Sequence, residues 1–191
     1  MARDFSYDIM PEIMRRWSTR AFSTSAIDEG EVLALLEAAR FAPSCYNDQP
    51  WRFIVARAPA EIAAMQSLLA EQNLLWAKHA PVLMLMLAKR SFTETGRDNY
   101  WHMFDSGTAW GYLSLEAERR GLITHAMGGF DRKRAVVLYN LPSDIAPIAV
   151  IAIGKPGDPA LLPPELRERE RPGLRKPLQT LLIDSTGDLS R

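Results

Sequence analysis

Two runs of basic residues could bind an anion. Residues 15–20 (RRWSTR) combine three arginines with two hydroxyl side chains, and residues 171–177 (RPGLRKP) lie near the other end of the chain. A guanidinium presents a fork of N–H donors that fits phosphate oxygens, and a hydroxyl adds a short hydrogen bond. Two alternatives stay open. The first run could be a solvated helix end whose arginines offset the helix dipole, and the second could be a solubilising tail.

Two further segments could contact a planar ligand. Residues 42–51 (APSCYNDQPW) hold small and polar side chains between two prolines, and residues 127–131 (MGGFD) contain a glycine pair. Rigid φ angles and clustered amides suit a loop that grips the polar edge of a ring, although a plain connector has the same turn chemistry. A glycine pair before a helix lets the backbone approach a ligand closely, but it often marks only a turn.

The elements that must position these segments follow from periodicity and from helix end signals. Asp28 is the expected N-cap of one helix, with Glu31 reaching back to the cap, and this helix must stop before Pro43. Expected helices span residues 8–16, 28–42, 59–72, 104–120 and 131–139, and expected strands span residues 51–56, 82–87, 123–127 and 148–153. Helices and strands mix without strict alternation, which indicates an α+β fold with helices packed on a sheet.

Composition limits the classes of protein. The chain has 191 residues, of which 47% are hydrophobic, and its 23 basic and 23 acidic residues give no net charge. This size fits a single domain over residues 1–191, and the zero charge argues against nonspecific binding to nucleic acid. The lone Cys45 cannot form an internal disulfide, no signal peptide is visible, and the longest apolar run, residues 80–88, is too short to span a membrane. We therefore expect a soluble cytoplasmic protein.

The C-terminal segment has a different composition. From Lys155 onward, prolines and glycines recur at positions 156, 157, 159, 163, 164, 172, 173 and 177. Such a density favours an extended arm over residues 155–191 and not a second domain. The histidines, His79, His102 and His125, have no metal-ligand spacing, and no serine-elbow, phosphate-loop or dinucleotide fingerprint occurs. We expect no metal site, and Cys45 has no nearby histidine to make it a nucleophile.

Taken in order, these segments resemble the nitroreductase family of FMN-dependent oxidoreductases. The resemblance rests on residues 16–20, the loop 42–51, Asn73, Gly121-Leu122 with residues 128–131, and residues 175–177. It covers nearly the whole chain, and the loop 42–51 is its most specific part. The resemblance implies an α+β fold with a central, mostly antiparallel sheet flanked by helices, and a C-terminal arm exchanged in a homodimer.

The resemblance also implies where FMN would bind. Arg16, Ser18 and Arg175 would hold its phosphate, and Trp17 would also contact the cofactor. Arg20 would lie near the N1/O2 side of the ring, where a cation stabilises the reduced flavin. Asn73 would bind the pyrimidine edge, the backbone at Gly128 and Gly129 would lie beside N5, and Met127 would also contact the cofactor. The partner subunit would supply Pro43, Ser44, Cys45 and Asn47. The reaction itself would occur at flavin N5, so no acid–base side chain is expected to be catalytic.

The implied activity is hydride transfer from NADH or NADPH to flavin N5, then electron transfer to a small-molecule acceptor such as a nitroaromatic or quinone, in a ping-pong sequence. Alternatives are other flavin chemistry on this fold (dehalogenation, dehydrogenation or flavin destruction), a noncatalytic flavin-binding regulator, or a plain interaction module that binds no flavin.

Four positions depart from the family pattern: Trp17, Cys45, Trp76, where some members carry a lysine near the flavin, and Gly173, where some carry a lysine. The residues after the apolar strand suggest a short substrate lid. Its candidate lining is Tyr100, Trp101, His102 and Phe104, which could equally be core aromatics.

Overall fold

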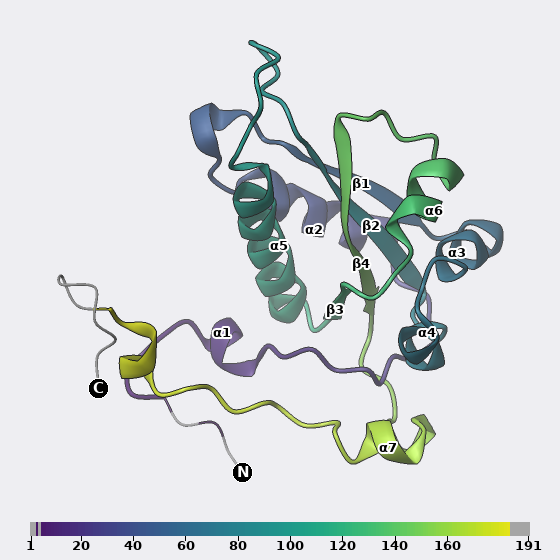
Figure 1. Ribbon diagram of the computed structural model, residues 1–191. Helices are drawn as coiled ribbons and strands as arrows, with labels where there is room; N and C mark the ends of the chain where they lie inside the picture. The colour runs from purple at the N-terminus through teal and green to yellow at the C-terminus, as the bar shows by residue number, and fades with distance from the viewer. Residues whose placement is uncertain (1–2, 4, 184–191) are drawn as a thin grey trace.

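A four-stranded antiparallel sheet forms the centre of the protein (Figure 1). The computed structural model describes residue 3 and residues 5–183. The strands are β1 (Trp51–Ala56), β2 (Val82–Lys89), β3 (Ile123–Met127) and β4 (Ile145–Gly154), in the order β1-β2-β4-β3, and every neighbouring pair is antiparallel. The predicted α+β class and antiparallel sheet are confirmed, as are the four predicted strands, two of which are longer than expected.

Helices cover both faces of this sheet. One face packs against α2 (Glu29–Arg40) and α5 (His102–Arg119), and the other packs against α3 (Pro59–Gln66), α4 (Glu71–Ala77) and α6 (Arg132–Leu138). The short helices α1 (Pro11–Arg15) and α7 (Pro164–Arg167) lie below the sheet in Figure 1, and Leu166 of α7 joins the core cluster of α3, α4 and α6.

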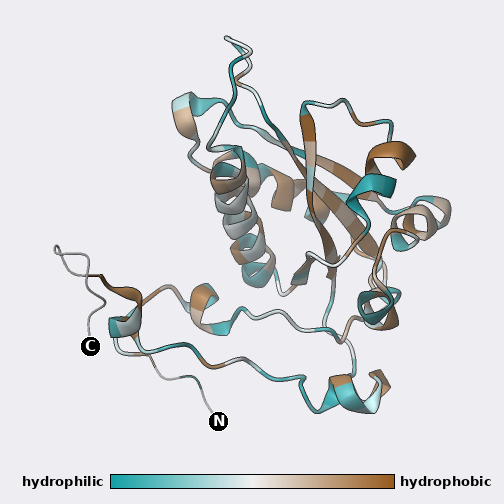
Figure 2. Ribbon diagram, in the orientation of Figure 1, coloured by the Kyte–Doolittle hydropathy of each residue, from teal (hydrophilic) through white to brown (hydrophobic). Residues whose placement is uncertain are grey.

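Strand β2 holds the two halves of the core together. Its residues alternate between the faces, as the period of two in a strand requires. Leu83 and Leu85 belong to the cluster with α3 and α4, whereas Met84 and Met86 belong to the cluster with α2 and α5. All four are at most 2% exposed. The strands accordingly form the apolar centre of Figure 2, and the prediction of a strand buried on both faces is confirmed.

The prediction of one helix over residues 59–72 is wrong. The chain forms α3, turns at residues 67–70, and begins α4 at Glu71. The backbone at the turn bonds to a distant segment: Asp131 donates to the carbonyl of Leu68 at 2.8 Å, and Ala70 donates to that of Gly129 at 3.1 Å. These long-range bonds replace the local bonds that would have continued the helix.

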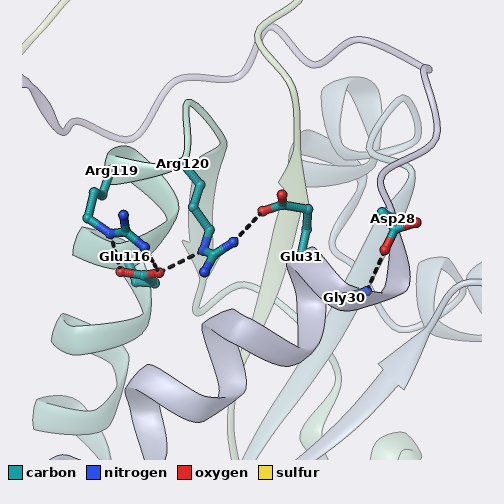
Figure 3. A network of polar contacts seen from close by, with 6 residues as sticks. All are labelled: Asp28, Gly30, Glu31, Glu116, Arg119 and Arg120. Carbon is teal, nitrogen blue, oxygen red and sulfur yellow. Dashed lines mark hydrogen bonds and ion pairs between the residues drawn. The ribbon is translucent and has the colours of Figure 1, made fainter.

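The predicted capping box at the start of α2 forms only in part. Asp28 caps the helix as expected and accepts a hydrogen bond from the Gly30 amide at 2.7 Å. Glu31 does not reach back to the cap; its carboxylate accepts from Arg120 at 3.1 Å (Figure 3). The guanidinium of Arg120 makes a charge-assisted hydrogen bond with the Glu31 carboxylate. As a donor, this charged group is a stronger partner than a neutral backbone amide.

The C-terminal segment runs beside the residues that follow α1 (Figure 1). Phe22 forms an antiparallel bridge with Pro156, and the Gly157 amide donates to the carbonyl of Ala21 at 2.8 Å. A Cβ on Gly157 would lie 2.4 Å from the Phe22 backbone, so only glycine permits this approach. Residues 171–183 are all exposed. None of the described helices is long and apolar enough to cross a membrane.

We predict an acid-sensitive contact at the end of α5. Hydrogen bonds from Arg119 and Arg120, both 2.6 Å, lower the pKa of Glu116 to about 2 (Figure 3). A carboxylate whose pKa is lowered by folding stabilises the fold above its unfolded pKa and loses that contribution as the pH falls. The free energy of unfolding, measured in urea, should therefore drop between about pH 5 and about pH 2.

Glu116→Gln should flatten this part of the pH profile, while the exposed Glu165→Gln should not. An unchanged profile in the Glu116 variant would contradict the assignment.

Candidate functional site

Arginines from the two ends of the chain meet in one cavity of about 250 Å³. Helix α1 ends at Arg15, and Arg16 takes an extended conformation (φ −56°, ψ 131°), which turns the following residues along the arm. The cavity is lined by Arg3, Arg16, Trp17, Ser18, Arg20, Arg169, Arg171, Gly173 and Arg175. The structure thus brings together five of the residues that the resemblance assigns to FMN, namely Arg16, Trp17, Ser18, Arg20 and Arg175. Arg171 comes from the second basic run described above, whereas Arg3 and Arg169 were not predicted.

Six of the residues that line the cavity are arginines. Partial burial lowers the pKa of Arg16, and the like charges of Arg175 and Arg3 lower it further. Arg3 donates to the carbonyls of Met14 at 3.1 Å and of Arg16 at 2.9 Å, which holds it against this group. Guanidiniums that repel one another around a cavity gain stability from a multivalent anion, and a phosphate monoester has the matching charge and oxygen geometry. These residues therefore fit the phosphate of FMN.

A carboxylate from the arm holds the segment that carries Arg20. Glu170 Oε1 accepts from the Thr19 hydroxyl, from the Arg20 amide at 2.7 Å and from the Ala21 amide at 3.0 Å. The Glu170 side chain is 2% exposed, and its second oxygen lies 3.8 Å from Arg20 Nη1. Glu170 was not predicted, because a glutamate between two arginines in a proline-rich arm has the composition of a solvated tail.

His125 on β3 holds the same segment from the opposite side. Its Nδ1 lies 3.0 Å from the carbonyl of Thr19, and its ring lies 4.4 Å from that of Trp76. Burial is the main cause that lowers the pKa of His125, and the charge of Arg20 adds to it. Trp76 is 1% exposed, so this departure from the family pattern is a core residue in the structure.

A second cluster joins α4 to the glycine pair. Asn73 Nδ2 donates to the carbonyl of Gly129 at 3.0 Å, and a Cβ on Gly129 would lie 2.9 Å from the same nitrogen. Gly128 is exposed, whereas Met127 packs in the core at 2% exposure. Trp76 follows Asn73 by about one helical turn, so the contact between Trp76 and His125 connects this cluster to Thr19 and the arginine cavity.

The loop 43–50 lies elsewhere. The Cys45 amide donates to Asp105 Oδ2 at 3.1 Å, and the Gln49 amide donates to Ser44 Oγ at 3.0 Å. Asn47 has a left-handed backbone (φ 56°), and Pro43 and Asn47 are exposed. The loop borders a different cavity of about 720 Å³, lined by Tyr46, Asn47, Asp48, Gln49, Trp51, Arg52, Phe92, Thr93, Glu94, Thr95 and Arg97.

The loop lies at the start of α5, whereas the segment at the end of α1, which leads into the arginine cavity, lies near the other end of α5 (Figure 1). Asp105, near the start of α5, binds Cys45, while Glu118, near its end, binds Arg15 at 3.2 Å. At 1.5 Å per residue, these two positions lie ~20 Å apart along the helix axis. The structure therefore does not bring Pro43, Ser44, Cys45 and Asn47 to the other predicted contacts in a single chain.

The aromatic residues before and at the start of α5 are not core residues. Tyr100 is 85% exposed, Phe104 71% and Trp101 48%, and Trp101 makes edge-on contacts with both of the others. The alternative that they are ordinary core aromatics is wrong for these three. His102 is partly buried, and its Nδ1 lies 2.7 Å from the carbonyl of Asn99.

Known proteins match both the sequence and the fold. The model of the nitroreductase family matches residues 13–155. The chain is 29% identical over 182 residues to an NADH dehydrogenase from Thermus thermophilus, covering 79% of this chain and 88% of that protein. It is 26% identical over 168 residues to an iodotyrosine deiodinase from Thermotoga neapolitana, covering 76% and 87%. A crystal structure described as an oxidoreductase containing FMN matches at TM-score 0.91 and 35% identity, covering 96% of this chain and 94% of that one.

The glycine pair offers a matched test of the Asn73 contact. Gly129→Ala places a Cβ against Asn73, so we expect a loss of about 1 kcal/mol and a fall in melting temperature of ~2–4 °C. At Gly128 a Cβ would meet nothing within 4 Å, and Gly128→Ala should leave the melting temperature within the scatter of surface substitutions. Equal effects of the two substitutions on the ligand-free protein would show that the contact does not form.

Proposed function

We propose that this chain, which belongs to the nitroreductase family, is an FMN-dependent oxidoreductase. It would oxidise NADH or NADPH and reduce a small-molecule acceptor such as a nitroaromatic or quinone. In the overall balance, the nicotinamide loses a hydride and its two electrons, and the acceptor gains two electrons and two protons, the second proton coming from water. The observation that carries this proposal is the arginine cavity, whose residues fit the phosphate of FMN.

The residues of the chain would bind and orient the cofactor. Arg16, Ser18 and Arg175 would hold the phosphate, and Arg20 would place a positive charge near the N1/O2 side of the ring. Asn73 and the backbone at Gly129, already joined by a hydrogen bond, would face the ring from the sheet side. FMN, when bound, supplies the hydride and electron chemistry, so the protein contributes position and charge.

We infer that two chains complete each site. The loop 43–50 and the arginine cavity lie at opposite ends of α5, so a second copy would have to supply the loop. The arm exposes apolar side chains that a partner would bury, namely Leu174, Leu178, Leu181, Leu182 and Ile183, at 46–64% exposure. An exposed apolar run of this kind is typical of an interface between subunits.

A second candidate function is reductive dehalogenation. It is favoured by the likeness to the iodotyrosine deiodinase. The exposed aromatic residues Tyr100, Trp101 and Phe104 would suit an aromatic substrate in either reaction. Assays with NADH or NADPH, comparing a quinone, a nitroaromatic and a halogenated phenol as acceptors, distinguish the two reactions.

The first test is the visible spectrum of the purified protein. We expect the absorption bands of oxidised FMN, which anaerobic NADH or NADPH should bleach. A protein that neither carries FMN nor gains thermal stability from added FMN would contradict the proposal. Bound FMN that is not bleached would favour a noncatalytic flavin-binding role.

The phosphate contact predicts a specific loss of affinity. Arg175→Gln removes one charge-assisted contact, worth ~1.5–3 kcal/mol, so the Kd for FMN should rise about tenfold to a hundredfold. Arg40 is an exposed arginine on α2, paired with Glu37, and Arg40→Gln serves as the control. Titration of the apoprotein with FMN measures both, and the assignment is wrong if the two variants bind alike.

The shared site predicts complementation between two defective chains. Arg175→Gln damages the cavity, and Asn47→Asp alters the loop with a residue that tolerates the left-handed backbone. Each variant alone should bind FMN weakly. After the two are mixed and allowed to exchange subunits, about one site in four should combine an intact cavity with an intact loop.

FMN titration of the mixture measures this recovery. If FMN binding does not recover, or if the protein sediments as a monomer at micromolar concentration, the site is not shared between subunits.

A further inference from the structure

We propose that Glu170 is a positioning residue that fixes Arg20 and sets the net charge that Arg20 presents to the cofactor. Glu170 lies in the arm, beyond residues 13–155 that the family model matches. The inference rests on the proposed FMN site. It assigns a role to a side chain that would act on the cofactor through Arg20 and would not contact it.

The first support is the geometry of one carboxylate oxygen. Glu170 Oε1 accepts hydrogen bonds from three consecutive residues, Thr19, Arg20 and Ala21. These residues belong to no helix, and without Glu170 the Arg20 amide would need another partner, while the Ala21 amide would keep only its 3.3 Å contact with the Thr19 hydroxyl. One anion therefore determines the backbone path of the segment from which the Arg20 side chain extends.

The second support is the other oxygen. Glu170 Oε2 is buried, and no described residue makes a hydrogen bond to it. Its nearest counter-charge is Arg20 Nη1 at 3.8 Å, an ion pair too long for a hydrogen bond. A buried carboxylate oxygen without a donor is unfavourable, so the guanidinium of Arg20 is drawn toward it.

The third support is the arrangement of charges around Glu170. Arg169 and Arg171, the neighbours of Glu170 in sequence, line the cavity, while Glu170 turns away from it toward Thr19. The arm thus adds three positive charges to the cavity wall, from Arg169, Arg171 and Arg175, and places one negative charge behind Arg20. This negative charge partly cancels that of Arg20 at short range in a poorly solvated setting, where charge interactions are strong.

Replacing Glu170 with glutamine removes the negative charge but keeps the shape of the side chain. This separates the positioning of Arg20 from the electrostatic effect on Arg20. In Glu170→Gln, the amide oxygen can still accept from the Arg20 and Ala21 amides, so the segment keeps its path. Arg20 then presents its full charge, which stabilises the negative charge of the reduced cofactor. We expect the midpoint potential of bound FMN to rise by about 30 mV, equal to a tenfold shift toward reduction for a two-electron couple.

Three measurements test the proposal. In Glu170→Gln, the Kd for FMN should stay within about threefold of the unaltered protein while the potential rises. In Glu170→Ala, which removes the acceptor as well, the Kd should rise at least tenfold, and trypsin should cleave the arm of the ligand-free protein faster. Glu168→Gln, on an exposed residue of the same arm, should change none of these.

The outcomes separate this inference from the proposed function. If the unaltered protein binds FMN and NADH reduces it, but Glu170→Gln leaves the potential unchanged, the function stands and the electrostatic role of Glu170 is wrong. If the protein binds no FMN, the proposed function fails. The anchoring role is then decided by trypsin alone, and equal cleavage of Glu170→Ala and the unaltered arm would overturn it.

Discussion

The backbone of residues 19–23 must satisfy its hydrogen-bonding groups outside any helix, and the arrangement of the site depends on how it does so. Glu170 and the strand-like contact at residues 155–157 satisfy it from the arm, and His125 satisfies it from the sheet. These bonds hold the two ends of the chain side by side. The arginines of both ends consequently face one cavity, although more than half the sequence separates them.

The sheet determines what one chain can and cannot assemble. Because β2 is buried on both faces, helices must cover both sides, and α5 runs across one of them as a rigid spacer. The spacer keeps the loop 43–50 at its start and the arginine cavity near its end. The FMN site that we propose needs both and would therefore be shared between two chains, with the exposed apolar side chains of the arm as the surface for the second chain. The charged residues are also unevenly distributed. The chain has no net charge, yet arginines gather around one cavity, and other arginines pair with acids elsewhere, as at Glu116.

Most of the fold could be predicted from local patterns, and the failures have a common cause. The strands, the two-sided burial of residues 82–87 and the Asp28 cap follow from periodicity and side-chain chemistry within a few residues. The break between α3 and α4 does not, because the bonds that stop the helix go to residues 129 and 131, far along the chain. Glu31 likewise does not bond to its expected cap. It pairs with Arg120, which lies near Glu31 only because α2 packs against α5.

Residue types and their order along the chain predict the chemistry of the site: guanidiniums and a hydroxyl at residues 16–20 and 175, an amide at Asn73 and a glycine pair. Which of these groups meet depends on how the chain folds. It joined Asn73 to Gly129, gathered Arg3, Arg169 and Arg171 into the cavity, and set the loop 43–50 apart. It also turned Glu170 inward against Thr19 and Arg20. Residue type governs what a group can bind, whereas proximity depends on burial and on backbone hydrogen bonds between distant segments, and these leave no local pattern in the sequence.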